Sequence, residues 1–184
     1  MNFVQPIRDA YLLEEIKDYL LRSSDKYGVR NRMMFVFGIN SGLRIQDILK
    51  LRVRDVQGDH IIMIEMKTRK KKFLKITPVL KRELKQYTEG RAGNEFLFQS
   101  RQGYNRPISR EMAYKILRKA ASEFDLVDIG THTMRKTWAY HLYQKTKDLT
   151  LVQKMLNHSS DDYTLRYIGM DQDRMDAAMD NFGL

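Results

Sequence analysis

Apolar positions recur at helical spacing along most of this chain. In residues 9–23 they mark one face of an amphipathic helix. Residues 30–42 are apolar on nearly every face, so they predict a largely buried helix that ends near Gly42. A short helix is expected next, over residues 44–51.

The periodicity changes between residues 60 and 77. The runs 60–66 and 71–77 have the character of β-strands, and the stretch KTRK between them is typical of a turn, so we expect a hairpin. Pro78 then opens a helix that Gly90 ends, and residues 94–100 suggest a short strand or an extended segment.

Helical patterns return in the second half of the chain. Ser109 is placed to cap a long amphipathic helix. The later segments with helical patterns are 132–146, 149–158, 162–169 and 171–182. The expected fold is mainly α with a small antiparallel β-sheet (α+β), and a length of 184 residues suits one domain.

The charge balance indicates a polyanionic partner. The chain has 33 lysines and arginines against 23 acidic residues, and these cations recur inside the predicted elements. A folded surface with a net charge of +10 favours a polyanion such as nucleic acid. No apolar run reaches the ~18–20 residues of a membrane-spanning helix, and the first residues do not resemble a signal peptide.

Cysteine is absent and the four histidines are dispersed. Disulfides, thiolate metal sites and cysteine nucleophiles are therefore excluded, and a cytoplasmic location is expected. Because no histidine pattern suits a metal, we expect neither a metal nor a cofactor.

Arg44 lies at a structural transition, just after Gly42 and at the start of a short helix. Free N–H groups at a helix start favour an anion, and a guanidinium can grip two phosphate oxygens. The alternative is a helix-start arginine paired with Asp47, three residues on.

The expected hairpin turn is strongly basic. Such a turn can contact DNA phosphates, although a charge run can also serve to protect a sheet edge. Five cations in six residues favour DNA contact: Lys67, Arg69, Lys70, Lys71 and Lys72.

His132 and Arg135 lie one helical turn apart, a pairing that suits a site for phosphoryl transfer. A surface helix start is the alternative. Lys136 points in a neighbouring direction where a DNA phosphate could lie. His158 follows a short helix, and Tyr167 comes nine residues later.

Taken together, these segments resemble the catalytic domain of the tyrosine recombinases, the phage integrase family. The resemblance covers about residues 9–170 and rests on SGLRIQDILKL, KTRKKKFLKITP, HTMR, LNHSS and the tyrosine that follows. It implies a site-specific recombinase that cleaves and rejoins DNA through a 3′-phosphotyrosine bond, without metal or ATP.

The resemblance also implies a role for each matching residue. Arg44 and Arg135 would hold the scissile phosphate, and Lys67 would be the general acid for the 5′-oxygen. His132 would assist proton transfer, His158 would hydrogen-bond the phosphate, and Tyr167 would attack it. Arg69 and Lys70 are fallback choices for the acid, and Tyr163 falls at the wrong spacing.

Two residues depart from the family pattern. Asn157 stands where glycine is usual, and asparagine tolerates a left-handed backbone. Asp47 stands where glutamate is commoner and could still orient Arg44.

The resemblance further implies a catalytic domain over 1–170 and a helical tail over 171–184. The tail could dock on a neighbouring protomer or fold back onto its own domain. We recognise no N-terminal DNA-binding domain of the kind that larger integrases carry. The implied partners are double-stranded DNA, further copies of the chain in a tetramer, and accessory proteins, with no membrane.

Two other functions remain open. One is a catalytically idle DNA-binding regulator on the same fold, and the other is an enzyme similar to type IB topoisomerases.

Overall fold

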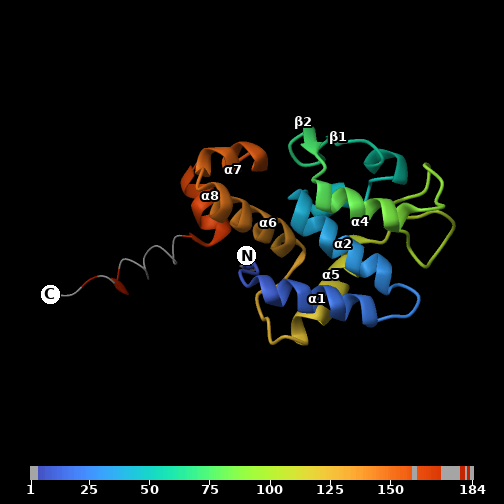
Figure 1. The fold of residues 1–184 in the computed structure, drawn as a ribbon, viewed down its shortest axis with the longest axis horizontal. Coiled ribbons are helices and arrows are strands. Elements are labelled where there is room, and N and C mark those ends of the chain that lie inside the picture. Colours follow the sequence, from blue (N-terminus) through green and yellow to red (C-terminus); the bar gives the residue numbers. More distant parts are fainter. Residues whose placement is uncertain (1–3, 159–160, 171–178, 181, 183–184) are drawn as a thin grey trace.

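The computed structural model describes residues 4–158, 161–170, 179–180 and 182. Its elements confirm the mainly α fold with one small antiparallel sheet (Figure 1). In chain order they are α1 (Ala10–Arg22), α2 (Gly28–Ser41), α3 (Ile45–Ile48), the 3₁₀ helix η1 (Val53–Val56), β1 (His60–Ile64), β2 (Lys71–Lys75), α4 (Pro78–Thr88), α5 (Arg110–Ser122), α6 (Thr131–Thr146), α7 (Leu149–Leu156) and α8 (Asp161–Ile168).

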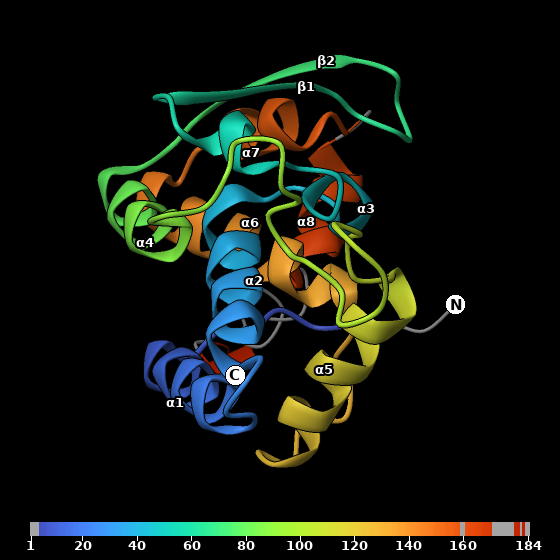
Figure 2. The same cartoon turned by 90° about the vertical axis from the view of Figure 1, so that its right-hand side faces the viewer.

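Helix α2 runs through the main hydrophobic core. Its residues Met33 to Gly38 are buried, so the helix has little amphipathic character. Helices α1, α4 and α6 pack against it, and α5 lies beside α1 (Figure 2). A helix that is apolar on every face must be covered on every face, as the sequence predicted.

A second, smaller core joins α6, α7 and α8. It is built on Ala139, Val152, Leu156, Ile168 and Met170. In Figure 1 these three helices form one end of the molecule, and α6 reaches from there into the main core. Helix α6 contributes Met134 to the main core and Ala139 to the smaller one, so both cores hold its first turns in place.

The N-terminal segment ties these two regions together. The N–H of Ile7 donates to Thr137 Oγ1 at 2.9 Å, and the carbonyl of Ile7 lies 3.0 Å from His141 Nε2. Arg8 donates to the carbonyl of Gly169, directly after α8, at 3.0 Å. His141 therefore has a structural contact, and it is not among the residues that match the family pattern.

The hairpin forms with an antiparallel register from His60 opposite Lys75 to Ile64 opposite Lys71. Residues 65–70 make the turn, and Arg69 within it has a left-handed backbone with φ 58°. Ile61 and Leu74 face the core, whereas Ile62 and Phe73 are exposed. The hairpin is thus a one-sided layer over the helices.

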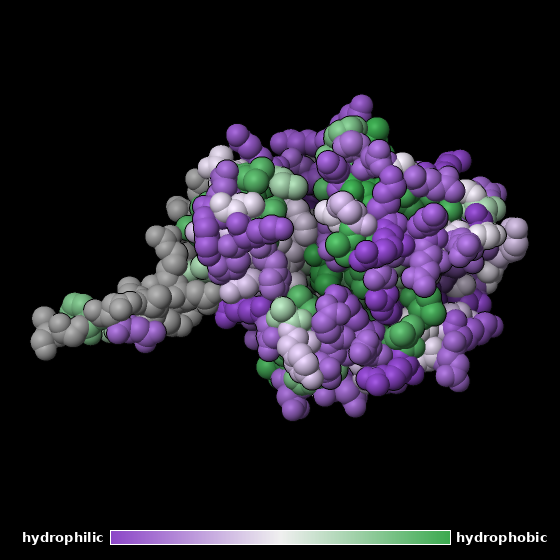
Figure 3. Space-filling view, viewed as in Figure 1, coloured by the Kyte–Doolittle hydropathy of each residue, from purple (hydrophilic) through white to green (hydrophobic). Residues whose placement is uncertain are grey.

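One expectation needs adjustment, because helix α3 is shorter than residues 44–51. Of the two alternatives for residues 94–100, the extended segment is confirmed: these residues form isolated bridges, one of which joins Phe96 to Arg52. The helix expected over 171–182 lies mostly outside the described residues. The face shown in Figure 3 is mainly hydrophilic, as the composition suggests.

Helices α2 and α6 approach closely at Gly42, which ends α2 with φ 62°. A Cβ placed on Gly42 would lie 2.3 Å from Trp138 Cε3. We expect Gly42→Ala to lower the free energy of unfolding by ~2–4 kcal/mol, because left-handed strain and overpacking add. Urea unfolding measures this change.

Gly90 provides the matched control. Its φ is 72°, but a Cβ there would meet nothing within 4 Å. Gly90→Ala should therefore show only the strain of about 1–2 kcal/mol. Equal losses in both variants would contradict close packing at Gly42.

Candidate functional site

Six residues singled out in the sequence come from separate elements. Arg44 precedes α3, Lys67 lies in the hairpin turn, and the first two turns of α6 carry His132 and Arg135. His158 follows α7, and Tyr167 lies in the last turn of α8. Besides burial, the charges of Arg135, Arg44 and Lys67 lower the pKa of both histidines, and the Tyr167 hydroxyl acts on the pKa of Arg135, so the six side chains share one electrostatic environment.

Arg135 is the most deeply buried of the six, with 2% of its surface exposed. Its guanidinium donates to the carbonyl of Gly42, after α2, and to that of Leu156, at 2.7 Å. Both carbonyls lie at helix C-termini, where positive charge is favoured. Burial lowers the pKa of Arg135, while the nearby Tyr167 hydroxyl opposes this shift. The two carbonyls therefore fix the orientation of the Arg135 guanidinium, which lies close to the Tyr167 hydroxyl.

Tyr167 is half-buried between two cationic or polar side chains. The ring of His158 meets the ring of Tyr167 edge-on, with the centroids 4.7 Å apart. The ammonium of Lys136 lies 5.1 Å from the centroid of the same tyrosine ring. Together with Arg135, these groups surround the phenol with two cationic side chains and one neutral imidazole.

Both histidines are held neutral at neutral pH. His158 Nδ1 lies 3.2 Å from Thr164 Oγ1, and burial followed by the charges of Arg135 and Arg44 lowers the pKa of His158 to about 4. Partial burial of its ring, then Arg110 and Arg135, lower the pKa of His132. A neutral imidazole keeps one N–H donor and one acceptor nitrogen, so it can donate a hydrogen bond to a phosphate oxygen or accept a proton.

The low pKa of His158 predicts sensitivity to acid. Between its folded value of about 4 and its ordinary value of 6.5, the unfolded chain binds more protons, so stability falls as the pH falls. We expect this histidine to account for about 1–2 kcal/mol of the stability lost between pH 7 and pH 5. Urea unfolding of wild type and His158→Gln at both pH values measures this loss. An identical pH dependence in the two proteins would contradict the shifted pKa.

The basic hairpin run divides into two groups. Lys67, Arg69, Lys70 and Lys71 are exposed. Lys72 is 9% exposed, and its ammonium donates to the carbonyl of Met155 near the end of α7. The expectation of a DNA contact assumed that all five lay on the surface. Lys72 departs from it because the alternation of β2 turns this residue inward with Leu74.

Burial also changes the chemistry of Lys72. It lowers the pKa of this lysine to about 8, reinforced by Arg135 and Arg44 and opposed by Glu65 and Asp47. Lys72 is therefore a cation within the site, at the junction of the hairpin and α7.

Lys136 also departs from the expectation of an exposed DNA contact. It is 7% exposed, and its ammonium lies against the ring of Tyr167. The face of α6 that carries Lys136 is covered by α8, an arrangement that helical spacing alone does not reveal.

Two buried carboxylates, Asp47 and Glu65, complete the centre, and both are 0% exposed. Arg44 Nη1 lies 3.0 Å from Glu65 Oε1, whereas Asp47 Oδ1 accepts from the N–H of Met66 at 2.9 Å. Arg44 thus pairs with Glu65, not with Asp47 as one reading of the sequence had it. Glu65 was missed, although its signal was present: it continues the inward-facing alternation of Ile61 and Met63.

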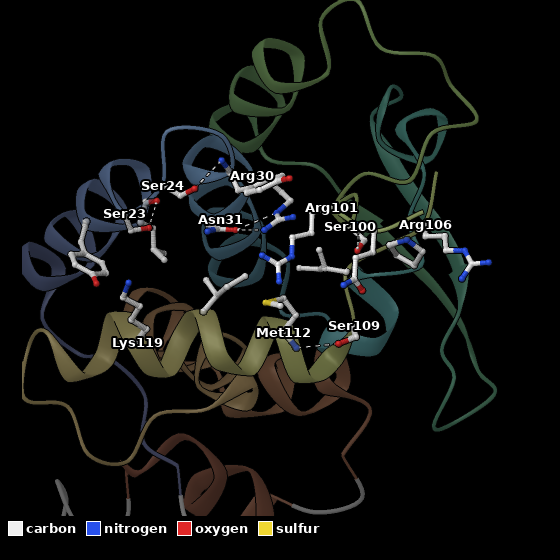
Figure 4. A pocket seen from close by; sticks show the side chains of 17 residues that line it. Ser23, Ser24, Arg30, Asn31, Ser100, Arg101, Arg106, Ser109, Met112 and Lys119 are labelled. Atoms are coloured by element: carbon white, nitrogen blue, oxygen red, sulfur yellow. Dashed lines mark hydrogen bonds between the residues drawn. The ribbon is translucent and has the colours of Figure 1, made fainter. Parts of the chain in front are cut away.

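Cavities lined by basic side chains lie both away from the six residues and beside them. One of about 590 Å³ lies between α1, α2 and α5, with Arg30, Arg101 and Lys119 projecting toward it (Figure 4). It contains none of the six residues. Another of about 560 Å³ opens beside His132 and is lined by Arg110 and Lys115. The second is therefore the one adjacent to the site.

The described part of the chain has neither a metal-ligand cluster nor a membrane-spanning helix. No group of three or more His, Cys, Asp or Glu side chains there could hold a metal ion. No helix among those residues is both long and apolar enough to cross a bilayer.

Comparison with known proteins gives consistent matches. The sequence pattern of the "Phage integrase family" matches residues 11–174. The chain is 50% identical over 184 residues to the "Probable integrase/recombinase YoeC" of Bacillus subtilis (strain 168), covering 100% of this chain and 99% of that protein. It is 30% identical to "Tyrosine recombinase XerC" of Neisseria meningitidis serogroup C (strain 053442), over 89% of this chain and 54% of that one.

Solved structures show the same fold. XerH recombinase bound to palindromic difH substrate matches with a TM-score of 0.71 and 21% identity, over 97% of this chain and 53% of that one. A lambda integrase dimer bound to a COC′ core site matches with a TM-score of 0.68 and 21% identity, over 91% and 48%. The chain thus spans about half the length of XerC and of these two proteins, and nearly the whole of YoeC.

Proposed function

This chain belongs to the phage integrase family, and on that premise we propose that it is a tyrosine recombinase, which cleaves and rejoins DNA strands at specific sites. The observation that carries the proposal is the placement of the Tyr167 phenol. It lies between the ring of His158 and the ammonium of Lys136, with the fixed guanidinium of Arg135 beside it.

In the proposed reaction, Arg44 and Arg135 bind the non-bridging oxygens of the scissile phosphate. Each guanidinium offers several N–H donors, and those that do not bind protein carbonyls or Glu65 are available for the phosphate. His158 donates a further hydrogen bond. The resulting positive charge stabilises the transition state where negative charge develops.

The covalent step exchanges one phosphoester bond for another. The Tyr167 oxygen attacks phosphorus, and its proton passes to a neutral group such as His132. The bond from phosphorus to the 5′-oxygen breaks, and Lys67 supplies the proton that this oxygen needs. A 3′-phosphotyrosine and a free 5′-hydroxyl result, and attack by a 5′-hydroxyl of another strand reverses the step. Because the phosphoester energy is kept, no ATP is required. The two arginines, the lysine and the hydrogen bonds of the histidines supply the charge stabilisation that a metal ion gives in other phosphoryl-transfer sites.

Double-stranded DNA is the proposed partner, and the cytoplasm the proposed location. The exposed cations of the hairpin turn and the basic cavity beside His132 are suited to phosphates on either side of the cleavage point. Strand exchange needs more than one active centre, so we also propose a tetramer on DNA, joined through the tail over 171–184.

Trapping on nicked DNA tests the function. A nick one or two nucleotides from the cleavage point lets the short 5′-hydroxyl product diffuse away, so the covalent complex accumulates. We expect a detergent-resistant complex on a library of random nicked duplexes, and sequencing of the attached DNA should return one preferred site. Tight binding with no covalent complex would favour a DNA-binding regulator. Covalent complexes without site preference, with relaxation of supercoils, would favour a topoisomerase.

Binding should depend steeply on salt, because neutralised phosphates release counterions. Lys71→Ala is expected to weaken binding of every duplex and to reduce the slope of log K against log salt by about 1. Lys17→Ala is the matched control, since Lys17 lies on α1 and pairs with Glu14 at 2.6 Å. Titration by fluorescence anisotropy at several salt concentrations measures both. An unchanged slope in Lys71→Ala would remove the start of β2, next to the hairpin turn, from the DNA surface.

A further inference from the structure

Glu65 lies at the point where three parts of the site meet. Its Oε1 is 3.0 Å from Arg44 Nη1, and its Oε2 accepts from Thr68 Oγ1 at 2.6 Å and from Asn157 Nδ2 at 2.9 Å. Thr68 directly follows Lys67, and Asn157 directly precedes His158. One carboxylate therefore contacts one proposed catalytic residue and the immediate neighbours of two others.

Thr68 and Asn157 donate hydrogen bonds to Oε2 of Glu65, and Arg44 forms an ion pair with Oε1. A fully buried carboxylate is costly unless its oxygens are satisfied, so these contacts define a narrow geometry. Burial raises the pKa of Glu65, but Thr68, Asn157 and Arg44 together hold it below the usual value. The group is therefore ionised at neutral pH, with its charge directed to the donors.

The end of α7 shows why this contact matters for His158. The carbonyl of Leu156 accepts from Arg135, the carbonyl of Met155 accepts from Lys72, and the side chain of Asn157 is held by Glu65. Asn157 itself has a left-handed backbone with φ 56°. Glycine could adopt that backbone, but it could not make the bond to Glu65. The side chain at 157 thus adds a tie between the hairpin and the segment that carries His158.

Resting on the proposed function, we propose that Glu65 is a positioning residue, which sets Arg44, the turn of Lys67 and the segment of His158 in register before DNA binds. It does not touch the reacting atoms. Its carboxylate, with that of Asp47, also offsets the mutual repulsion of Arg44, Lys72 and Arg135. After burial, Arg135 and Arg44 lower the pKa of Lys72, and Arg44 lowers the pKa of Arg135. Without it, the three cations would separate and the phosphate would meet a looser site.

Glu65→Gln is the sharpest variant because it keeps the shape of the side chain. The NH₂ group of the new amide must point either at Arg44 or at Thr68 and Asn157. In the first orientation the contact with Arg44 is lost, and in the second the hydrogen bond from Asn157 is lost. At saturating nicked DNA we expect the rate of covalent complex formation to fall about 10- to 100-fold, the range that a small misplacement produces. DNA affinity should stay within about threefold, since no DNA-facing cation is removed.

A double-variant cycle distinguishes positioning from two unrelated losses. Asn157→Gly alone should slow cleavage, but it should add little to Glu65→Gln, because both remove the same tie. Glu83→Gln is the matched control. Glu83 is a half-buried glutamate that pairs with Arg32 at 2.7 Å between α4 and α2, and its loss should leave cleavage unchanged. The proposal would be overturned if the double variant slowed cleavage by the product of the two single effects. It would also be overturned if Glu83→Gln slowed cleavage as much as Glu65→Gln does.

The pH profile gives a readout that a purely structural role would not move. Lys72 faces Glu65 in the hairpin, Arg135 on α6, and Arg44 and Asp47 at α3. The ammonium of Lys72 donates to the carbonyl of Met155, close before the segment that carries His158. Removing the charge of Glu65 lets Lys72 lose its proton at lower pH and weakens this contact, so the cleavage rate of Glu65→Gln should begin to fall at a lower alkaline pH than that of wild type. An unchanged alkaline limb would count against the proposal.

Wild type separates this proposal from the function on which it rests. If wild type forms no covalent complex, the proposed function fails whatever the variants do. The placement of His158 can then be followed by NMR of the histidine rings. The ring signals of His158 should shift in Glu65→Gln and in Asn157→Gly but not in Glu83→Gln, and a common spectrum in all four proteins would overturn the positioning role.

Discussion

Replacing Tyr167 by phenylalanine is expected to abolish the covalent complex with nicked DNA. The phenylalanine ring keeps the edge contact with His158 and the face offered to Lys136, so it removes the phenol oxygen and little else. Loss of a nucleophile lowers the chemical rate by at least about 10³-fold, which brings the complex below detection on a denaturing gel. DNA affinity should remain within about threefold, since no cation is lost.

Tyr163→Phe is the matched control for this prediction. Tyr163 lies one helical turn before Tyr167 in α8, and its replacement should leave the covalent complex in place. A complex that survives Tyr167→Phe and disappears in Tyr163→Phe would move the nucleophile to the other tyrosine.

Replacing Arg135 by lysine is expected to affect both stability and cleavage. One ammonium cannot reach the carbonyls of Gly42 and Leu156 and still offer a pair of donors to a phosphate. We expect the free energy of unfolding to fall by about 1–3 kcal/mol for the carbonyl left without a donor. The cleavage rate at saturating DNA should fall about 10²- to 10³-fold.

Arg118→Lys separates the structural part of this effect from the chemical part. Arg118, on α5, also donates to backbone carbonyls, those of Val127 and Ile129, but outside the six-residue site. Arg118→Lys should lower stability slightly and leave cleavage as in wild type. Cleavage by Arg135→Lys at the wild-type rate, measured in the same single-turnover assay, would remove Arg135 from the phosphate.

Most of the fold could be predicted because local patterns and tertiary packing agree. The hairpin, the capping of α5 by Ser109 and the end of α2 at Gly42 all follow from residue type and period. The residues 94–100 could not be assigned, because an extended segment becomes a strand only when a partner lies beside it. Phe96 finds just an isolated bridge to Arg52.

The candidate site divides in the same way. Arg44, Arg135 and His158 were found through their order along the chain, and packing brings their elements together. Lys72 was predicted to contact DNA because a basic run looks uniform in sequence, whereas the pleat of β2 turns this one residue inward. Burial of a charged group depends on partners distant in sequence, here Met155, which lies 83 residues away along the chain.

Glu65 illustrates the limit of local patterns most clearly. The inward position of Glu65 could be predicted from the alternation along β1. Its pairing with Arg44 could not, because Asp47 is also a carboxylate and is nearer to Arg44 in sequence. The choice between the two carboxylates is made by the way the hairpin folds over α3. Asp47 then accepts a hydrogen bond from the N–H of Met66, and Glu65 forms the ion pair with Arg44.

Peptide mapping of the trapped complex tests the central claim most directly, because it identifies the residue joined to DNA. Trypsin cuts after Lys154, Arg166 and Arg174, so the two candidate tyrosines fall in different peptides, 155–166 and 167–174. After nuclease digestion, mass spectrometry should find a nucleotide 3′-phosphate on Tyr167 in the peptide 167–174. A nucleotide on the peptide 155–166, or on neither peptide, would contradict the account.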